Sequence, residues 1–304
     1  MLSFSPLDGD EFLITDKKKS GQNMKKSLLI FTGILVLILS LNGANAIHSQ
    51  KLTRNISEGD RYFNELVMQN EIAETEVSHT ILAGPLSHRQ KLARKYDHIL
   101  IFINGHGTLR SGSDAYSIEP ESIALTNAKK RVLIEVAAGD TLHYIHIKKK
   151  LSKLDLKEMK TFPPENREGI YFKGFEDCEA YTEKIKSPNT VSRTVLPKDH
   201  APRVAMGTVD TKGPDAVGAH EHPMLDQLFL GLSANDAMVF ADTDSIAFHE
   251  WEILHIPIGA SHWVTVGENK RMYYQWMDFF LTTSGQEWLK THKKIEDYKN
   301  TEKK

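Results

Sequence analysis

The chain has 304 residues, a formal net charge of −2 and a pI near 6.7. This balance excludes the broad basic surface of a nucleic-acid-binding protein, so we expect no nucleic-acid partner. Hydrophobic residues make up 40% of the chain and charged residues 26%, which is ordinary for one large or two average globular domains.

The N-terminal segment, residues 1–46, has the pattern of a secretory leader. Lys25 and Lys26 give it a charged start, and residues 28–41 form an apolar run. A small-x-small sequence, typical of a signal-peptidase site, follows and ends at Ala46. The apolar run is shorter than the ~20 residues of a membrane-spanning helix. We therefore predict a signal peptide that is cleaved after Ala46.

The leader sets the expected location of the protein. The polar stretch ahead of the apolar run suggests that translation starts at Met24. Cleavage would give a periplasmic or secreted protein with no stable membrane span, and the alternative is a retained N-terminal anchor. Cys178 is the only cysteine, so no intramolecular disulfide is expected in this exported chain.

Two regions downstream show the alternation and turn signals of β-strands. Residues 96–109 and 131–148 predict an all-β first half. Residues 226–236 resemble residues 97–107 at an offset of 129, and a second match, around residue 266, lies at an offset of 130. Such a fixed offset indicates an internal duplication of a small barrel or sandwich.

These signals divide the chain into five parts. The prolines and the weak helical patterns of the middle segment predict a connector with short helices. Ser284 and Glu287 form a capping-box pattern, which predicts an amphipathic helix followed by a frayed tail. The expected boundaries are a leader at 1–46, an N-terminal barrel at 47–150, a connector at 151–197, a C-terminal barrel at 198–283, and the helix and tail at 284–304.

The second copy of the duplicated unit contains a cluster of side chains of the kinds that bind metal ions. His220 and His222 share one face of a strand, about 7 Å apart, if the segment is extended. Gln227 follows closely, and His262 comes after a proline-glycine turn. Three imidazoles and one amide predict a site for one divalent ion, with Zn, Ni, Mn and Fe all open. Asp226 is the alternative to Gln227 as the fourth ligand.

One later strand offers further site residues. Tyr274, Trp276, Asp278 and Phe280 alternate to one side, so they would line the barrel interior as substrate-binding side chains. Among aromatic rings, desolvation would raise the pKa of Asp278 and suit it to catalytic proton transfer. The alternative is that the rings are core and Asp278 caps the strand. Arg203 could hold a substrate carboxylate bidentately.

These residues resemble the motifs of the cupin superfamily. Gly213, His220, His222 and Gln227 follow the order of its first motif, and the segment that ends at His262 matches P-x-G-x2-H of its second. The resemblance implies an all-β fold of two tandem cupin barrels, each a double-stranded β-helix or jelly roll. The chain is thus similar to bicupins.

The second barrel resembles a narrower family. H-x-H-x4-Q with a later His is similar to the pectin-degradation cupins, which open the ring of unsaturated uronates, and Asp278-x-Phe280 and Glu287-Trp288 fit that family. An arginine expected between these two segments is absent. The family has one barrel, and the resemblance covers about residues 203–290.

In the first copy, the ligand positions are occupied differently. Subtracting the offset gives Lys91, Ala93 and His98, of which only His98 could coordinate a metal. We therefore expect an N-terminal barrel without a metal site, which would serve packing, substrate capture or the formation of a homodimer.

Neutral ligands leave the full charge on the ion, which favours Lewis-acid chemistry. The leading hypothesis is an enzyme that isomerises, ring-opens or eliminates a small sugar acid or hydroxy-carbonyl compound, with Asp278 as the proton shuttle. One alternative is a dioxygenase of the quercetin- or dione-cleaving type. Another is a non-catalytic periplasmic carbohydrate-binding cupin.

Overall fold

The computed structural model describes residues 47–127 and 131–294. The predicted leader, at residues 1–46, and the end of the predicted tail, at residues 295–304, lie outside the described residues. Across the described ranges, no helix has the length and apolar character needed to cross a membrane.

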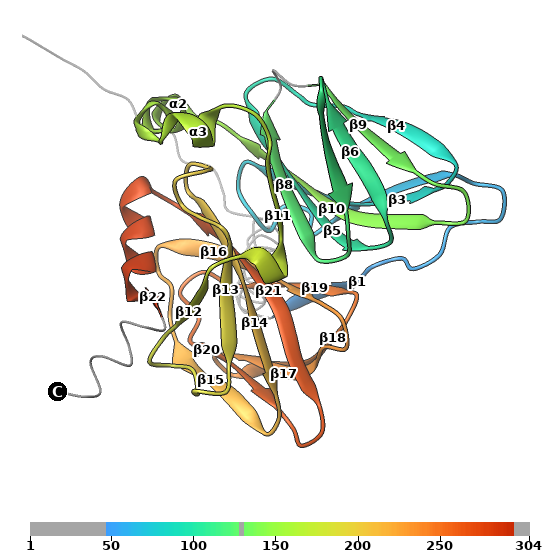
Figure 1. Ribbon diagram of the computed structural model, residues 1–304. Coiled ribbons are helices and arrows are strands. Elements are labelled where there is room, and N and C mark those ends of the chain that lie inside the picture. The colour runs from blue at the N-terminus through green and yellow to red at the C-terminus, as the bar shows by residue number, and fades with distance from the viewer. Residues whose placement is uncertain (1–46, 128–130, 295–304) are drawn as a thin grey trace, which may run out of the picture. The chain divides into compact units, whose positions relative to one another are not determined.

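The first barrel consists of two antiparallel sheets (Figure 1). The larger sheet has the strand order β11-β8-β5-β10-β3-β2, and the smaller one has the order β4-β9-β6-β7. Its strands are β2 (Tyr62–Val67), β3 (Thr75–Ala83), β4 (Leu86–Gln90), β5 (Tyr96–Asn104), β6 (Gly107–Ser111), β7 (Asp114–Ile118), β8 (Ser122–Asn127), β9 (Val132–Val136), β10 (Thr141–Lys150) and β11 (Tyr171–Gly174).

The second barrel has an eight-stranded and a four-stranded sheet. Their strand orders are β1-β19-β16-β21-β14-β13-β12-β22 and β15-β20-β17-β18. The strands are β1 (His48–Lys51), β12 (Ala180–Thr182), β13 (Val191–Leu196), β14 (Val204–Lys212), β15 (Asp215–His220), β16 (Leu225–Gly231), β17 (Asp236–Ala241), β18 (Asp244–His249), β19 (Glu252–Ile256), β20 (His262–Val266), β21 (Arg271–Phe280) and β22 (Lys293–Lys294). The predicted fold of two tandem all-β barrels is confirmed.

The two barrels repeat one arrangement of strands. Strands β3, β5 and β10 correspond to β14, β16 and β21 in the large sheets, and β4 and β9 correspond to β15 and β20 in the small ones. A close backbone contact is also repeated: a Cβ on Gly84 would lie 1.7 Å from the carbonyl oxygen of Ala137, and one on Gly213 would lie 1.9 Å from that of Gly267. Only glycine fits both places.

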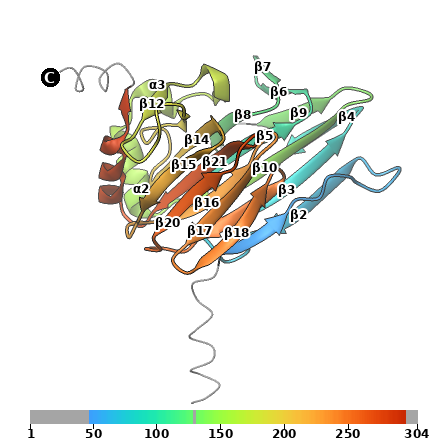
Figure 2. The same ribbon diagram turned by 90° about the horizontal axis from the view of Figure 1, so that it is seen from below.

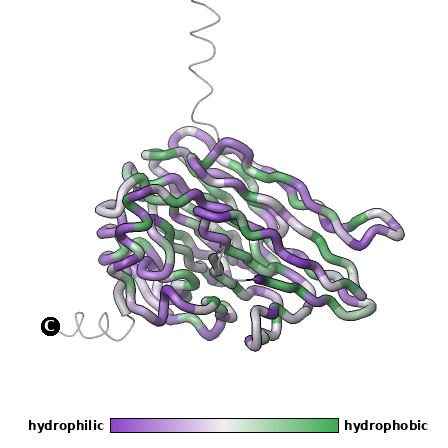
Figure 3. Tube along the Cα trace, turned by 90° about the horizontal axis from the view of Figure 1, so that it is seen from above, coloured by the Kyte–Doolittle hydropathy of each residue, from purple (hydrophilic) through white to green (hydrophobic). Residues whose placement is uncertain are grey.

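Each barrel has its own interior core, and a third core joins the barrels. Residues alternate along the strands, so one face of each large sheet fills its own barrel and the other face packs against the large sheet of the other barrel. Figure 3 shows hydrophobic and hydrophilic residues following one another along the trace. In Figure 2 the strands of the two large sheets run in similar directions. The shared core contains Ile101 and Ile147 from the first barrel with Leu230 and Met277 from the second, all fully buried.

The segment predicted as a connector contains more than short helices. It has α2 (Lys153–Glu158), η1 (Met159–Thr161), α3 (Pro164–Arg167) and η2 (Phe175–Asp177). It also supplies β11 to the large sheet of the first barrel, and β12 and β13 to that of the second. The chain therefore enters the second barrel earlier than residue 198. β1, at the start of the described chain, pairs with β19 of the second barrel.

The C-terminal helix is present, but its form differs from the expectation. Thr283–Thr291 forms η3, a 3-10 helix whose N-cap is Thr282, without a side-chain cap hydrogen bond. The prediction of a capping box from Ser284 to Glu287 is therefore wrong. The hydroxyl of Ser284 lies 2.9 Å from that of Thr282, and Glu287 pairs with Lys290 instead of reaching back to the cap.

Candidate metal centre

Three histidines converge inside the second barrel because two strands of its small sheet end at the same place. His220 ends β15, His262 begins β20, and the two are register partners across a bulge. His222 follows two residues after His220. One nitrogen from each ring lies within 4.8 Å of the other two, which is a spacing that one metal ion can bridge.

Backbone carbonyls orient two of these rings. Nδ1 of His220 lies 2.8 Å from the carbonyl oxygen of Gly218, and Nδ1 of His262 lies 3.1 Å from that of Ala260. Because a carbonyl oxygen only accepts, both Nδ1 atoms carry the proton and donate. Nε2 of each ring is therefore left with its lone pair, as a metal ligand requires.

Burial keeps the three rings neutral. Burial and the neighbouring imidazoles lower the pKa of His222 to about 2. Burial and His220 lower the pKa of His262 to about 3, and burial also lowers the pKa of His220. Neutral imidazole is the form that binds a metal, so protons do not compete with an ion near neutral pH.

Gln227 completes the set from the neighbouring sheet. Its Nε2 donates to Oδ1 of Asp278 at 2.6 Å, which turns Oε1 away from that carboxylate. Oε1 is buried and has no hydrogen-bond partner among the described residues, and the same holds for Nδ1 of His222 and Nε2 of His262. Buried polar atoms of this kind normally have a partner, so these residues fit a bound cation. Asp226 faces the other way, with Oδ1 3.4 Å from Nε2 of His255.

Asp278 lies directly opposite Gln227 on β21. Its side chain is buried, and burial raises its pKa to about 7 although the hydrogen bond from Gln227 acts against that shift. Tyr274 and Trp276 line the same cavity from β21. Phe280 is fully buried in the core of the second barrel and is not among the described residues that line the cavity.

The cavity beside the histidines is small and has a second, unforeseen wall. Its volume is about 30 Å³. Tyr181, Glu183 and Lys186 line it from β12 and the loop that follows, and Trp288 and His292 line it from the C-terminal segment. Tyr181, Glu183 and Lys186 were not predicted as site residues because residues 151–197 were expected to form a connector, and residues 284–304 were expected to form a helix and tail without a role in the cavity. The alternation of Tyr181, Glu183 and Ile185 is a strand signal that could have found the first two.

Two aromatic contacts join the C-terminal segment to the residues that line the cavity. The ring of Trp288 meets that of His222 edge-on, with the centroids 4.8 Å apart. The ring of His292 stacks on Tyr181 at 4.2 Å, and β22 pairs with β12 next to it. We refer to residues 283–294 as the cover segment, because it lies over the histidines.

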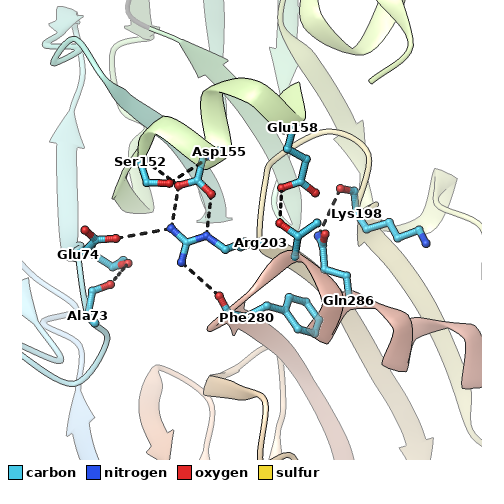
Figure 4. Close-up of polar contacts among 11 residues, drawn as sticks. Ala73, Glu74, Ser152, Asp155, Glu158, Lys198, Arg203, Phe280 and Gln286 are labelled. Atoms are coloured by element: carbon cyan, nitrogen blue, oxygen red, sulfur yellow. Dashed lines mark hydrogen bonds and ion pairs between the residues drawn. The ribbon is translucent and has the colours of Figure 1, made fainter. Parts of the chain in front are cut away.

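Arg203, which the sequence suggested for substrate binding, lies elsewhere (Figure 4). Its guanidinium donates to both carboxylate oxygens of Asp155 in α2 at 2.7 Å, and it also pairs with Glu74 at 3.5 Å. Among the residues that the structure describes, those lining the cavity do not include Arg203. The partner that holds it is 48 residues away in sequence, so no local pattern could reveal the pair.

The interior of the first barrel differs chemically from this centre. His98 occupies the position of Gln227, and His146 lies beside it, with His146 Nε2 3.0 Å from His98 Nδ1. A chain of hydrogen bonds runs from the hydroxyl of Tyr144 to Gln90, His146, His98 and finally the carbonyl oxygen of Ala93. These groups satisfy one another, whereas the equivalent groups of the second barrel do not.

Comparison with solved structures defines the class of fold. The chain is similar to the E. coli protein Ylba, with a TM-score of 0.59 and 11% identity over 78% of this chain and 91% of that one. It is also similar to a cupin 2 conserved barrel domain protein from Leptotrichia buccalis, with a TM-score of 0.52 and 14% identity over 75% and 92%. Its TM-score with Lactobacillus farciminis oxalate decarboxylase is 0.56, with 12% identity over 81% of this chain and 90% of that one.

No protein-family model and no curated protein sequence matches the chain. The likeness to solved structures, at these identities, concerns the fold. The described residues have the cupin fold in the form of two tandem barrels, a fold that solved structures of oxalate decarboxylase share.

Proposed function

We propose that the protein is an exported, metal-dependent bicupin enzyme. Its second barrel would hold one divalent ion through His220, His222, His262 and Gln227. The observation that carries the proposal is the state of Gln227: its amide nitrogen is bound to Asp278, while its buried amide oxygen has no partner among the described residues and lies with three neutral imidazoles.

When bound, a divalent ion polarises a hydroxyl or carbonyl oxygen of the substrate as a Lewis acid. The remaining chemistry belongs to the chain. Asp278, with a pKa raised to about 7, can take up a proton from the substrate at Oδ2 and return it to another atom. Gln227 holds Oδ1 of the same carboxyl group, so the side chain keeps one orientation during both transfers.

The walls of the cavity support such a reaction. Tyr274, Trp276 and Phe229 line it together with aliphatic side chains from both sheets. Apolar walls exclude water, which strengthens polar interactions at the reacting atoms. A small sugar acid or another hydroxy-carbonyl compound would then undergo isomerisation, ring opening or elimination, in the periplasm or outside the cell.

The experiment is a turnover screen of the metal-loaded protein. Unsaturated uronates and short hydroxy-carbonyl compounds are supplied, products are followed by NMR, and dissolved oxygen is recorded in the same vessel. The proposal expects an isomerised, ring-opened or eliminated product without oxygen uptake, and no product from the His220→Ala/His222→Ala variant. Oxygen consumption in step with product would support the dioxygenase alternative, and bound ligand without any product would support a carbohydrate-binding protein.

A further inference from the structure

A buried ion pair forms part of the cavity wall. Nζ of Lys186 lies 2.6 Å from Oε2 of Glu183, and the two side chains are only 4% and 9% exposed. Nζ also donates to the hydroxyl of Tyr181 at 3.0 Å. None of these three residues belongs to the set of metal ligands, so the metal centre does not explain them.

Stability does not explain the pair either. Taking two charges out of water costs several kcal/mol each, and apolar side chains of similar volume often replace a buried ion pair without loss. The apolar neighbours Ile185, Val209 and Val217 line the same cavity. A charged pair at this place is therefore best explained by what the cavity binds.

Glu183 acts as the fixed partner of Lys186. Its Oε1 lies 3.2 Å from Nε2 of His292 and 3.4 Å from the hydroxyl of Thr291, both in the cover segment. Burial alone would raise the pKa of Glu183, but the contacts with His292 and Lys186 outweigh burial and lower it. Glu183 thus stays ionised and holds the ammonium group of Lys186 against the cavity.

The ammonium group of Lys186 has one N–H donor left for a ligand. An ammonium group has three N–H donors, and two of them serve Glu183 and Tyr181. Lys186 lines the same cavity as Asp278 and His220. Among the described residues that line the cavity, it is the only lysine or arginine. A negatively charged oxygen in the cavity would find its hydrogen-bond donor here.

The size of the cavity limits the ligand. A volume of about 30 Å³ holds roughly two water molecules. With the cover segment in place, only a few heavy atoms fit between Lys186 and the histidines, so for a larger substrate this space would take only the carboxylate and the atoms beside it.

We infer that Lys186 is the specificity-determining residue of the site and that it selects a short carboxylate with a neighbouring oxygen, such as a 2-hydroxy or 2-oxo acid. This inference rests on the proposed function, because the neighbouring oxygen would face the ion held by the histidines. The carboxylate accepts a hydrogen bond from Lys186, the role that the sequence had suggested for Arg203.

The test compares two probes that differ in charge. Binding of glycolate and of its neutral analogue glycolamide is measured by calorimetry on the metal-loaded protein, and the metal content of every sample is recorded. Lys186→Met is compared with wild type, with Lys186→Arg, and with Lys184→Met, which removes an exposed lysine from the same loop. Glu183→Gln/Lys186→Met removes both charges, so it tests the idea even if the single variant folds poorly.

We expect Lys186→Met and the double variant to weaken glycolate binding about tenfold or more, since a hydrogen bond to a charged group contributes about 1.5–3 kcal/mol. Glycolamide binding and metal content should stay unchanged. Lys186→Arg should keep part of the glycolate preference, and Lys184→Met should keep all of it.

A metal-loaded wild type that binds the two probes equally would overturn this inference alone. So would an equal loss of both probes in Lys186→Met. A wild-type protein that takes up no metal would overturn the proposed function, and this inference with it.

Discussion

At the scale of single residues, Gln227 connects the two halves of the site. Its amide nitrogen donates to Asp278, while its buried amide oxygen has no partner among the described residues, so in the proposed site this one side chain would link the metal ligands to the carboxyl group that transfers the proton. A glutamate at this position would put a second carboxylate against Asp278. The amide avoids that repulsion and would leave the charge of a bound ion undiminished.

Asp278→Asn separates catalysis from metal binding. The Asn oxygen can still accept from Gln227, so we expect an unchanged metal content, but Asn cannot take up a proton. Turnover should fall by about 10²–10⁴-fold, the usual contribution of general acid-base catalysis. Steady-state kinetics and elemental analysis measure both. Asp226→Asn, on the opposite face of β16, is the matched control, and an Asp278→Asn enzyme with full turnover would exclude the proton-shuttle role.

The sequence predicts part of the site from spacing alone. His220, His222 and Gln227 lie within eight residues, and His262 stands in the segment that matches the second motif, so the sequence predicted a set of which the structure brings the three histidines together. Tyr181, Glu183 and Lys186 lie in a three-residue strand and the loop after it, so the short alternation of Tyr181, Glu183 and Ile185 marks a strand but does not show that it lines the cavity. Their position depends on pairing with β13 and β22, which is set by distant parts of the chain.

At the scale of elements, α2 is held to the end of β21 and to the cover segment (Figure 4). Arg203 binds Asp155 and lies 3.4 Å from the carbonyl oxygen of Phe280, while the hydroxyl of Thr283 donates to Glu158 at 3.0 Å. Burial would raise the pKa of Asp155, but hydrogen bonds from Arg203 and Ser152 outweigh it and hold the pKa at about 2. The junction therefore depends on an ionised Asp155.

Removing Arg203 should reveal this dependence. We expect Arg203→Met to lower the free energy of unfolding by about 3 kcal/mol at pH 7, as for other broken ion pairs with little exposure. The contribution of Asp155 is present above its unfolded-state pKa, near 4, and is lost as the pH falls toward 2. The difference between variant and wild type should thus shrink over that range in urea unfolding.

Arg89→Met, which changes an exposed arginine, is the control for Arg203→Met. Turnover by the folded Arg203→Met protein should match wild type, because Arg203 lies outside the cavity. A specific rise in KM with unaltered stability would mean that Arg203 binds substrate after all.

A second prediction at this scale concerns the cover segment. Trp288 packs against His222, so Trp288→Ala should open the site to solvent and speed removal of the metal by a chelator by about tenfold, although the bound metal content before chelation stays the same. Trp263→Ala is the control, since Trp263 stacks on Phe240 and is not one of the described residues lining the cavity. Equal release rates in both variants would show that the cover segment does not control access.

At the scale of the whole molecule, the two barrels share a core. The duplication was visible in sequence because the strand patterns repeat at offsets of 129 and 130. The shared core and the pairing of β1 with β19 were not visible, because a strand pattern does not say which sheet a strand joins.

A shared core implies joint unfolding. Ile101 is fully buried between the large sheets, so Ile101→Ala should cost about 2–5 kcal/mol. We expect one calorimetric transition in the metal-free protein, moved as a whole by this substitution, although Ile101 belongs to the first barrel only. Two transitions, of which the substitution moves one, would show that the barrels fold independently.

Metal content tests the central claim most directly. In the first barrel, His98 and His146 are satisfied by their own hydrogen bonds, whereas Nδ1 of His222, Oε1 of Gln227 and Nε2 of His262 in the second barrel have no hydrogen-bond partner among the described residues. Elemental analysis of purified protein should give one divalent ion per chain, and His220→Ala/His222→Ala should give none, while His98→Ala keeps the ion. A wild-type protein without metal, or an ion retained by the double variant, would contradict this account.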